Sequence, residues 1–169
     1  MLGPGSAADG LAVLADYTKE QLEIEDKRKT SFEQRGLAVV TTSGALVTLL
    51  FGLAALSTKA QQTFVLEAAA KPPLAAALGL FVVAALAALL TNLPLNYEWP
   101  DREKLLEALR ADPPVAEQVA LKKVAITRLD VLKAARSKNE FKGKALIVAI
   151  AIEVVAVGAV AVAVAIVIL

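Results

Sequence analysis

The stretch "ALIVAIAIEVVAVGAVAVAVAIVIL", residues 145–169, decides the fold class of this chain. Its single charged residue is Glu153, and every other side chain is Leu, Ile, Val, Ala or Gly. A helix of about 20 such residues crosses a hydrocarbon core ~30 Å thick. A lone strand of this composition would leave its backbone groups unpaired in lipid. The stretch therefore predicts a transmembrane helix.

Two more stretches, residues 36–56 and 74–95, are long and apolar enough to span a membrane. Hydrophobic residues make up 57% of the 169, which is more than soluble domains carry. We therefore expect an all-α integral membrane protein with three transmembrane helices. The first apolar stretch follows a long charged segment, so we expect it to stay as an anchor rather than be removed as a signal peptide.

Cysteine and histidine are both absent from the sequence. Disulfides, thiolate metal sites, cysteine nucleophiles and histidine acid–base chemistry are thereby excluded. Walker sequences, glycine-rich nucleotide turns and nucleophile elbows are absent as well. We expect a protein that is not an enzyme and that holds no cofactor and no metal.

The distribution of Lys and Arg predicts the orientation. Residues 1–35 carry five, residues 57–73 carry two and residues 96–144 carry eleven. Because Lys and Arg concentrate on the cytoplasmic side, we expect a cytoplasmic N-terminal helix (1–35), an external loop (57–73) and a cytoplasmic helical insert (96–144). The C-terminus would then lie outside the inner membrane. The cytoplasmic parts also carry most of the acidic residues, so we expect no nucleic-acid partner.

Two long helices are expected to extend from the membrane as a cytoplasmic stalk. The first would run without a break over residues 9–56, and the second would begin near Val115 and continue into the third span, with Gly143 as its weak point. Both run toward the membrane, so we expect them to pair in parallel. Each has a narrow apolar stripe: Leu11, Leu14, Thr18 and Leu22 on the first, and Leu121, Ala125, Leu129 and Leu132 on the second.

Glu153 is the candidate functional residue within the membrane. It follows Lys144 by nine residues, which places it ~13.5 Å deep by helix rise and level with Gly44 of the first span. One interpretation is a hydrogen bond that joins the two spans, and a second is a ring of Glu153 residues that lines a pore in an oligomer. A proton relay is a third. In the first interpretation, one of the hydroxyl residues at this depth makes the hydrogen bond; they are Thr41, Thr42, Ser43 and Thr48.

Small residues and basic residues supply two further sets of candidates. Gly36, Gly44 and Gly52 lie on one ridge of the first span, a pattern that favours close packing of helices from the same or another chain; Gly158 is a candidate in the third span. Candidate contacts for a phosphate ligand or for anionic lipid headgroups come from the insert, with a solvated helix face as the alternative. They are Lys122, Lys123 and Arg128.

The order of these parts resembles that of the Pycsar-effector-type transmembrane domain, of other small bacterial anti-phage membrane effectors, and of uncharacterised actinobacterial three-span proteins. The resemblance rests on "KTSFEQRGLAVVTTSGALVTLLFGLAAL" in the first helix and "VLKAARSKNEFKGKALIVAIAIEVVAVG" at the entry to the third span. It implies a signal-triggered effector that impairs the inner membrane during phage infection. No nucleotide-binding module is recognisable, so the resemblance carries no residue-level site.

The functional expectation is an oligomeric inner-membrane effector or pore that is gated through its cytoplasmic helices. Its partners would be the lipid bilayer, further copies of the chain, and a cyclic nucleotide or a cytoplasmic protein as the trigger. The alternative is a non-conducting membrane scaffold that recruits a cytoplasmic partner through the stalk.

Overall fold

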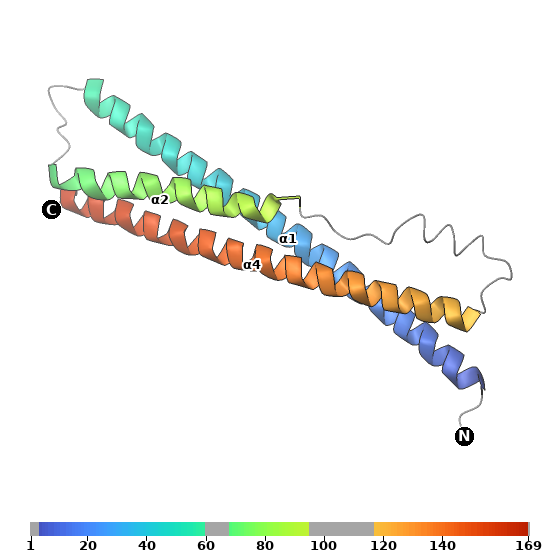
Figure 1. The fold of residues 1–169 in the computed structure, drawn as a ribbon. Coiled ribbons are helices and arrows are strands. Elements are labelled where there is room, and N and C mark those ends of the chain that lie inside the picture. Colours follow the sequence, from blue (N-terminus) through green and yellow to red (C-terminus); the bar gives the residue numbers. More distant parts are fainter. Residues whose placement is uncertain (1–3, 60–67, 95–116, 169) are drawn as a thin grey trace. The chain divides into compact units, whose positions relative to one another are not determined.

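The computed structural model describes residues 4–59, 68–94 and 117–168 (Figure 1). All of these residues are helical except residues 93–94. Within these residues, three helices are long and apolar enough to cross a membrane. The predicted all-α class with three candidate spans is therefore confirmed. The helices are α1 (Pro4–Lys59), α2 (Lys71–Leu89) and α4 (Glu117–Ile168), with short 3-10 turns η1 (Ala68–Ala70) and η2 (Leu90–Asn92) on either side of α2.

Proline residues lie at both ends of the helical segment formed by α2 and η2. Two prolines, Pro72 and Pro73, lie in its first turn, where their missing N–H groups would have had no intrahelical partner. After η2, Leu93 adopts the extended conformation. Pro94 follows it, and a residue before proline is disfavoured in the helical region.

The long helices α1 and α4 are unbroken, as the sequence predicted. Helix α1 extends beyond the expected residues 9–56 at both ends. Helix α4 continues through Gly143, because one glycine costs a helix only about 1 kcal/mol. The expected start of this helix near Val115 lies outside the described residues. The span boundaries themselves depend on lipid and stay predictions.

The chain divides into two compact units, and α1 and α4 contribute to both. Unit 1 comprises Met1–Thr30 and Pro94–Glu140, and unit 2 comprises Ser31–Leu93 and Phe141–Leu169. Each unit is described by itself below.

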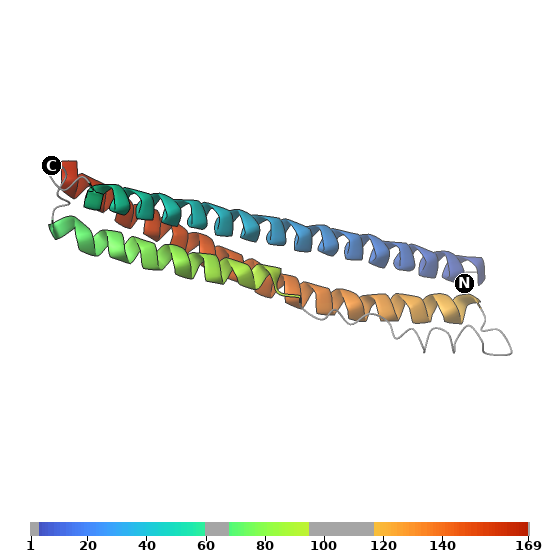
Figure 2. The ribbon, with the colours of Figure 1, turned by 90° about the horizontal axis from the view of Figure 1, so that it is seen from above.

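In unit 1, α1 and α4 pack side by side and run in the same direction (Figure 2). The Arg128 guanidinium donates to the carbonyl of Ala15 over 2.9 Å, and eleven residues later Asn139 donates to Glu25. Because the residue numbers of the contacts increase along both helices in the same direction, the two helices are parallel. The predicted parallel pairing of the two helices is confirmed for this unit.

Buried and half-buried positions along the two helices of unit 1 are spaced three and four residues apart, the pattern of a coiled-coil seam. The predicted stripes were wrong in one position on each helix, since Leu14 is 56% exposed and Leu129 is 50% exposed. Their neighbours Ala15 and Arg128 point into the seam instead. The seam residues are Ala15, Thr18, Leu22 and Glu25 on α1, and Ala125, Arg128, Leu132, Ala135 and Asn139 on α4.

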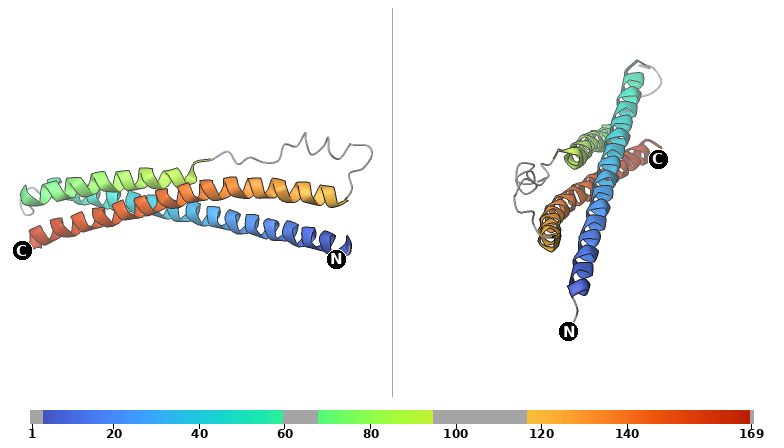
Figure 3. Two further views of the ribbon diagram at one scale, coloured as in Figure 1. Left: turned by 60° about the horizontal axis from the view of Figure 1, so that its bottom comes forward. Right: turned by 90° about the vertical axis from the view of Figure 1, so that its right-hand side faces the viewer.

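Unit 2 is a bundle of three helices in which α2 runs antiparallel to the other two (Figure 3). Ala88, near the end of α2, packs with Val39 of α1 and Leu146 of α4. Phe81, nearer its beginning, packs with Ala156, ten residues further along α4. The seam is rich in alanine, which lets helices approach closely where lipid provides no hydrophobic driving force. Its buried alanines are Ala77, Ala84, Ala88, Ala149, Ala156 and Ala163.

Large apolar side chains of unit 2 point outward. Phe51, Leu86 and Val154 are each more than half exposed. A soluble bundle would bury such side chains, whereas a bundle in a bilayer directs them to lipid. This distribution agrees with unit 2 as the membrane-embedded part.

Candidate functional site

The candidate site lies in unit 2, where Glu153 of α4 meets Ser43 of α1. The Ser43 hydroxyl donates to Oε1 of Glu153 over 3.2 Å. Ser43 is completely buried and Glu153 is half-buried. The predicted contact between the first and third spans is therefore present, and Glu153 lies level with Ser43, next to the predicted Gly44.

The other three hydroxyl residues do not reach Glu153. Thr41, Thr42 and Thr48 are exposed, and each donates to the carbonyl four residues earlier on its own helix. The prediction was a hydrogen bond from one of the four hydroxyls without a choice among them, because depth alone does not decide which helix face a side chain occupies. Only a residue on the seam face, as Ser43 is, can reach α4.

The arrangement binds two helices together through a carboxyl group in an apolar setting. A carboxyl group has two oxygen atoms and can accept further hydrogen bonds. Because Glu153 is only half-buried, it can also accept from water or from another chain. The geometry thus supports the helix-joining interpretation and leaves room for a second partner.

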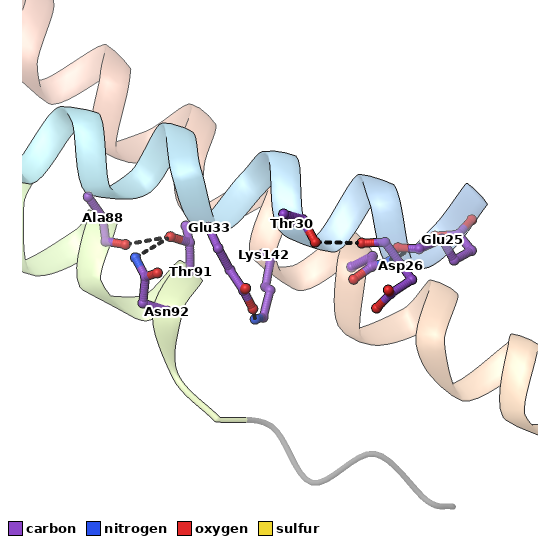
Figure 4. Close-up of polar contacts among 9 residues, drawn as sticks. Glu25, Asp26, Thr30, Glu33, Ala88, Thr91, Asn92 and Lys142 are labelled. Atoms are coloured by element: carbon purple, nitrogen blue, oxygen red, sulfur yellow. Dashed lines mark hydrogen bonds and ion pairs between the residues drawn. The ribbon is translucent and has the colours of Figure 1, made fainter. Parts of the chain in front are cut away.

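The glycines of the predicted ridge have different surroundings in the structure. Gly36 is buried against α2: a Cβ atom added to it would lie 1.9 Å from Oγ1 of Thr91 and 3.1 Å from the carbonyl oxygen of Ala88. The Thr91 hydroxyl donates to this same carbonyl over 2.8 Å (Figure 4). This close approach requires glycine on α1 at position 36.

Gly44, Gly52 and Gly158 have open space where a Cβ atom would lie. Among the described residues, no neighbouring helix packs against these three glycines, which corrects the prediction of one common packing ridge. Residues four apart on a helix are rotated by about 40° around the helix axis. Gly52 lies four such steps after Gly36 and therefore faces ~160° away from it. Packing of these three glycines against another chain stays a prediction.

Two polar contacts escaped the sequence analysis, and the first borders the apolar part of unit 2. Lys142 is 1% exposed, and its ammonium group pairs with the carboxylate of Glu33, which points toward it (Figure 4). Next to it, the ring of Phe32 packs on Gly143, where an added Cβ atom would lie 3.3 Å from the ring. The heptad register would have revealed this contact, since Lys142 precedes the buried Ala149 by seven residues.

The second lies in the seam of unit 1. The amide nitrogen of Asn139 donates to the backbone carbonyl and to Oε2 of Glu25, both over 2.8 Å. The Nε atom of Arg136 lies 3.5 Å from Oε1 of Glu25, and its Nη2 atom donates to Oε1 of Gln21 over 2.9 Å. The Oδ1 atom of Asn139 is buried, and none of the residues that the structure describes donates a hydrogen bond to it. A polar layer of this kind fixes the register of a coiled coil at a cost in stability.

The three basic candidates do not form one patch. Arg128 is engaged with the Ala15 carbonyl in the seam, while Lys122 and Lys123 are exposed. Adjacent helical residues project about 100° apart, so even the two lysines face different directions. The predicted joint anion site is wrong for Arg128, and lipid or phosphate contact by the lysines stays a prediction.

Within residues 4–59, 68–94 and 117–168, no group of three acidic side chains gathers to hold a metal ion. Comparison with known proteins finds no matching family model, no matching curated protein and no matching solved structure.

Proposed function

We propose that this protein is an oligomeric effector or pore of the inner membrane, whose apolar bundle responds to a signal received by the charged helices. The observation that carries the proposal is the hydrogen bond from Ser43 to Glu153. A charged side chain at mid-span costs roughly 2.5 to 3.5 kcal/mol on insertion scales and is found facing protein or water. Glu153 is therefore the residue most suited to line or close a water path.

The continuity of the helices supports a route for the signal. Ser43 lies on α1 and Glu153 on α4, and both helices extend without a break into the charged sequences of unit 1. A ligand that shifts α1 against α4 there would act on the helices that carry Ser43 and Glu153. The carboxyl group released from Ser43 would then need water or another copy as its partner.

The proposed topology has a cytoplasmic N-terminus and an external C-terminus, and it rests on the excess of Lys and Arg in residues 1–35 and 96–144. The resemblance to anti-phage effectors favours a cyclic nucleotide or a partner protein as the trigger and membrane impairment as the outcome. Reporter fusions at both termini test the topology.

Membrane potential tests the effector activity. A potential-sensitive dye would be followed in bacteria that express the wild type, Glu153→Ala or Ser43→Ala, with and without candidate cyclic nucleotides. We expect depolarisation with the wild type, none with Glu153→Ala, and depolarisation without a trigger for Ser43→Ala. Thr48→Ala is the matched control, because that hydroxyl donates only within its own helix, and it should behave as the wild type. The proposal would be refuted if the wild type never depolarised the membrane.

A non-conducting scaffold is the second candidate. It is favoured by apolar side chains that unit 1 exposes, among them Tyr17 at 56% and Val13 at 68%. A scaffold would leave the membrane potential unchanged in every variant and would lose its cytoplasmic partner on Tyr17→Glu.

A further inference from the structure

Glu153 is the only charged residue within the apolar parts of the unit 2 helices. Residues 36–58, 72–93 and 145–168 contain no other Asp, Glu, Lys or Arg. The nearest basic residue on α4 is Lys144, nine positions before Glu153 and therefore ~13.5 Å away along the helix axis. This separation is too large for an ion pair, so no basic residue of the same helix compensates the carboxyl group.

The buried Lys142 does not compensate Glu153 either. It precedes Glu153 by eleven residues, which corresponds to ~16.5 Å along the helix axis. Its ammonium group is already paired with the carboxylate of Glu33 (Figure 4). The pair as a whole is neutral, so it adds no positive charge that would attract an anion into unit 2.

The hydroxyl groups near Glu153 have all committed their protons. Ser43 donates to Oε1 of Glu153 over 3.2 Å. Thr41, Thr42 and Thr48 donate to carbonyls of their own helix over 2.8 to 2.9 Å, and this direction is fixed because a carbonyl has no proton to give. These residues still offer the lone pairs of their oxygen atoms and the second oxygen of the Glu153 carboxyl group.

Oxygen acceptors without free donors suit a cation and do not suit an anion. Cations are bound by carboxylate, hydroxyl and water oxygens, whereas an anion needs positive charges or N–H and O–H donors. The backbone N–H groups at this level bond within the helices. When Ser43 separates from Glu153, its hydroxyl can donate to its own helix, as the three threonines do, so the open state presents no new donor.

We propose that Glu153 is the specificity-determining residue of the membrane path, and that this path admits small cations and excludes anions. The inference rests on the proposed function, because it names the kind of ion that the pore passes. An alkali cation and a proton share the required chemistry, and the measurements below separate the two.

Currents across planar lipid bilayers that contain the purified full-length protein test the kind of ion. The wild type, with candidate cyclic nucleotides, is compared with Ser43→Ala, which we expect to open without a trigger. Under a potassium chloride gradient at equal pH, the reversal potential should show a preference for potassium over chloride of about tenfold or more, since a charge ~4 Å from an ion contributes at least this factor. A current that follows only a pH gradient would identify the cation as the proton.

Two substitutions separate the charge of Glu153 from its size. Glu153→Gln keeps the size but removes the charge and adds two N–H donors, so the preference for cations should fall about tenfold. Glu153→Asp keeps the charge and should keep the preference. Asp130→Asn is the matched control, because it makes the same carboxyl-to-amide change at an exposed position of unit 1 and should leave the preference unchanged.

The possible outcomes distinguish the inference from the proposed function. Currents that prefer chloride, or that prefer neither ion, would overturn the inference and leave the pore standing. A Glu153→Gln protein that keeps the full preference for cations would also overturn it, because the selectivity would then lie elsewhere. A Glu153→Gln protein without current, beside a cation-selective Glu153→Asp, would support the inference. If neither the wild type nor Ser43→Ala conducts, the proposed pore fails together with the inference.

Discussion

The substitution Gly36→Ala tests the close approach of α1 and α2 in unit 2. The added methyl group would lie 1.9 Å from Oγ1 of Thr91 and 3.1 Å from the carbonyl oxygen of Ala88. Thr91 is completely buried and its hydroxyl is bonded to that carbonyl, so its side chain cannot simply turn away. To reach an ordinary contact distance, Oγ1 would have to retreat by ~1.5 Å.

The magnitude follows from two opposing terms. Overpacking of this kind costs about 1 to 3 kcal/mol. Replacing glycine by alanine within a helix contributes up to about 1 kcal/mol in the other direction. Gly44→Ala is the matched control, because Gly44 lies on the same helix with open space around it and gains only the second term. We therefore expect Gly36→Ala to be less stable than Gly44→Ala by about 1 to 3 kcal/mol.

The assay is unfolding in mixed micelles by a denaturing detergent, followed by circular dichroism. Adding Thr91→Ala to Gly36→Ala removes the clashing hydroxyl and should recover most of the loss, whereas Thr91→Ala alone should destabilise through the lost hydrogen bond. Equal stability of the two glycine variants, within about 0.5 kcal/mol, would refute the close contact that we describe.

Two further predictions concern the seam of unit 1. The pair Thr18→Cys and Leu132→Cys should form an intramolecular disulfide under mild oxidation, since Thr18 lies seven residues before Glu25 and Leu132 seven before its bonded partner Asn139. Asp130→Cys in place of Leu132→Cys is the control and should form no disulfide with Thr18→Cys. Equal disulfide yields for the two pairs in a gel-mobility assay would contradict the register. Asn139→Leu alone should cost about 1 to 3 kcal/mol in detergent unfolding, because it leaves the buried Glu25 carboxylate short of its donor. Adding Glu25→Leu should recover this loss, and a double variant less stable than the single one would argue against the reasoning.

Residue type and depth in the sequence were sufficient to place Glu153 beside the first span, but not to choose its partner. Thr41, Thr42, Ser43 and Thr48 all lie at a suitable depth. Ser43 reaches Glu153 because it lies on the seam, in step with the buried Gly36 and Val39. A heptad count over the whole of α1 would have singled it out.

The same reason explains the errors in the stalk. Selecting leucines placed Leu14 and Leu129 in the helix contact, where the structure has Ala15 and Arg128. Leucine is the usual seam residue of a coiled coil in water. The seam of unit 1 consists mostly of small and polar residues, with Leu22 and Leu132 as its large apolar members, so hydrophobicity alone misidentifies it.

The sequence by itself determined the helical class, the three apolar helices and the parallel course of α1 and α4. These properties depend on composition and on the absence of helix breakers, which are local. Only the tertiary structure decided the contacts between helices. They are the hydrogen bonds of Ser43 with Glu153 and of Asn139 with Glu25, and the close packing of Thr91 on Gly36. Such pairings depend on the rotation of one helix against another, and a displacement of a single residue turns a side chain by about 100°, from the seam to the surface.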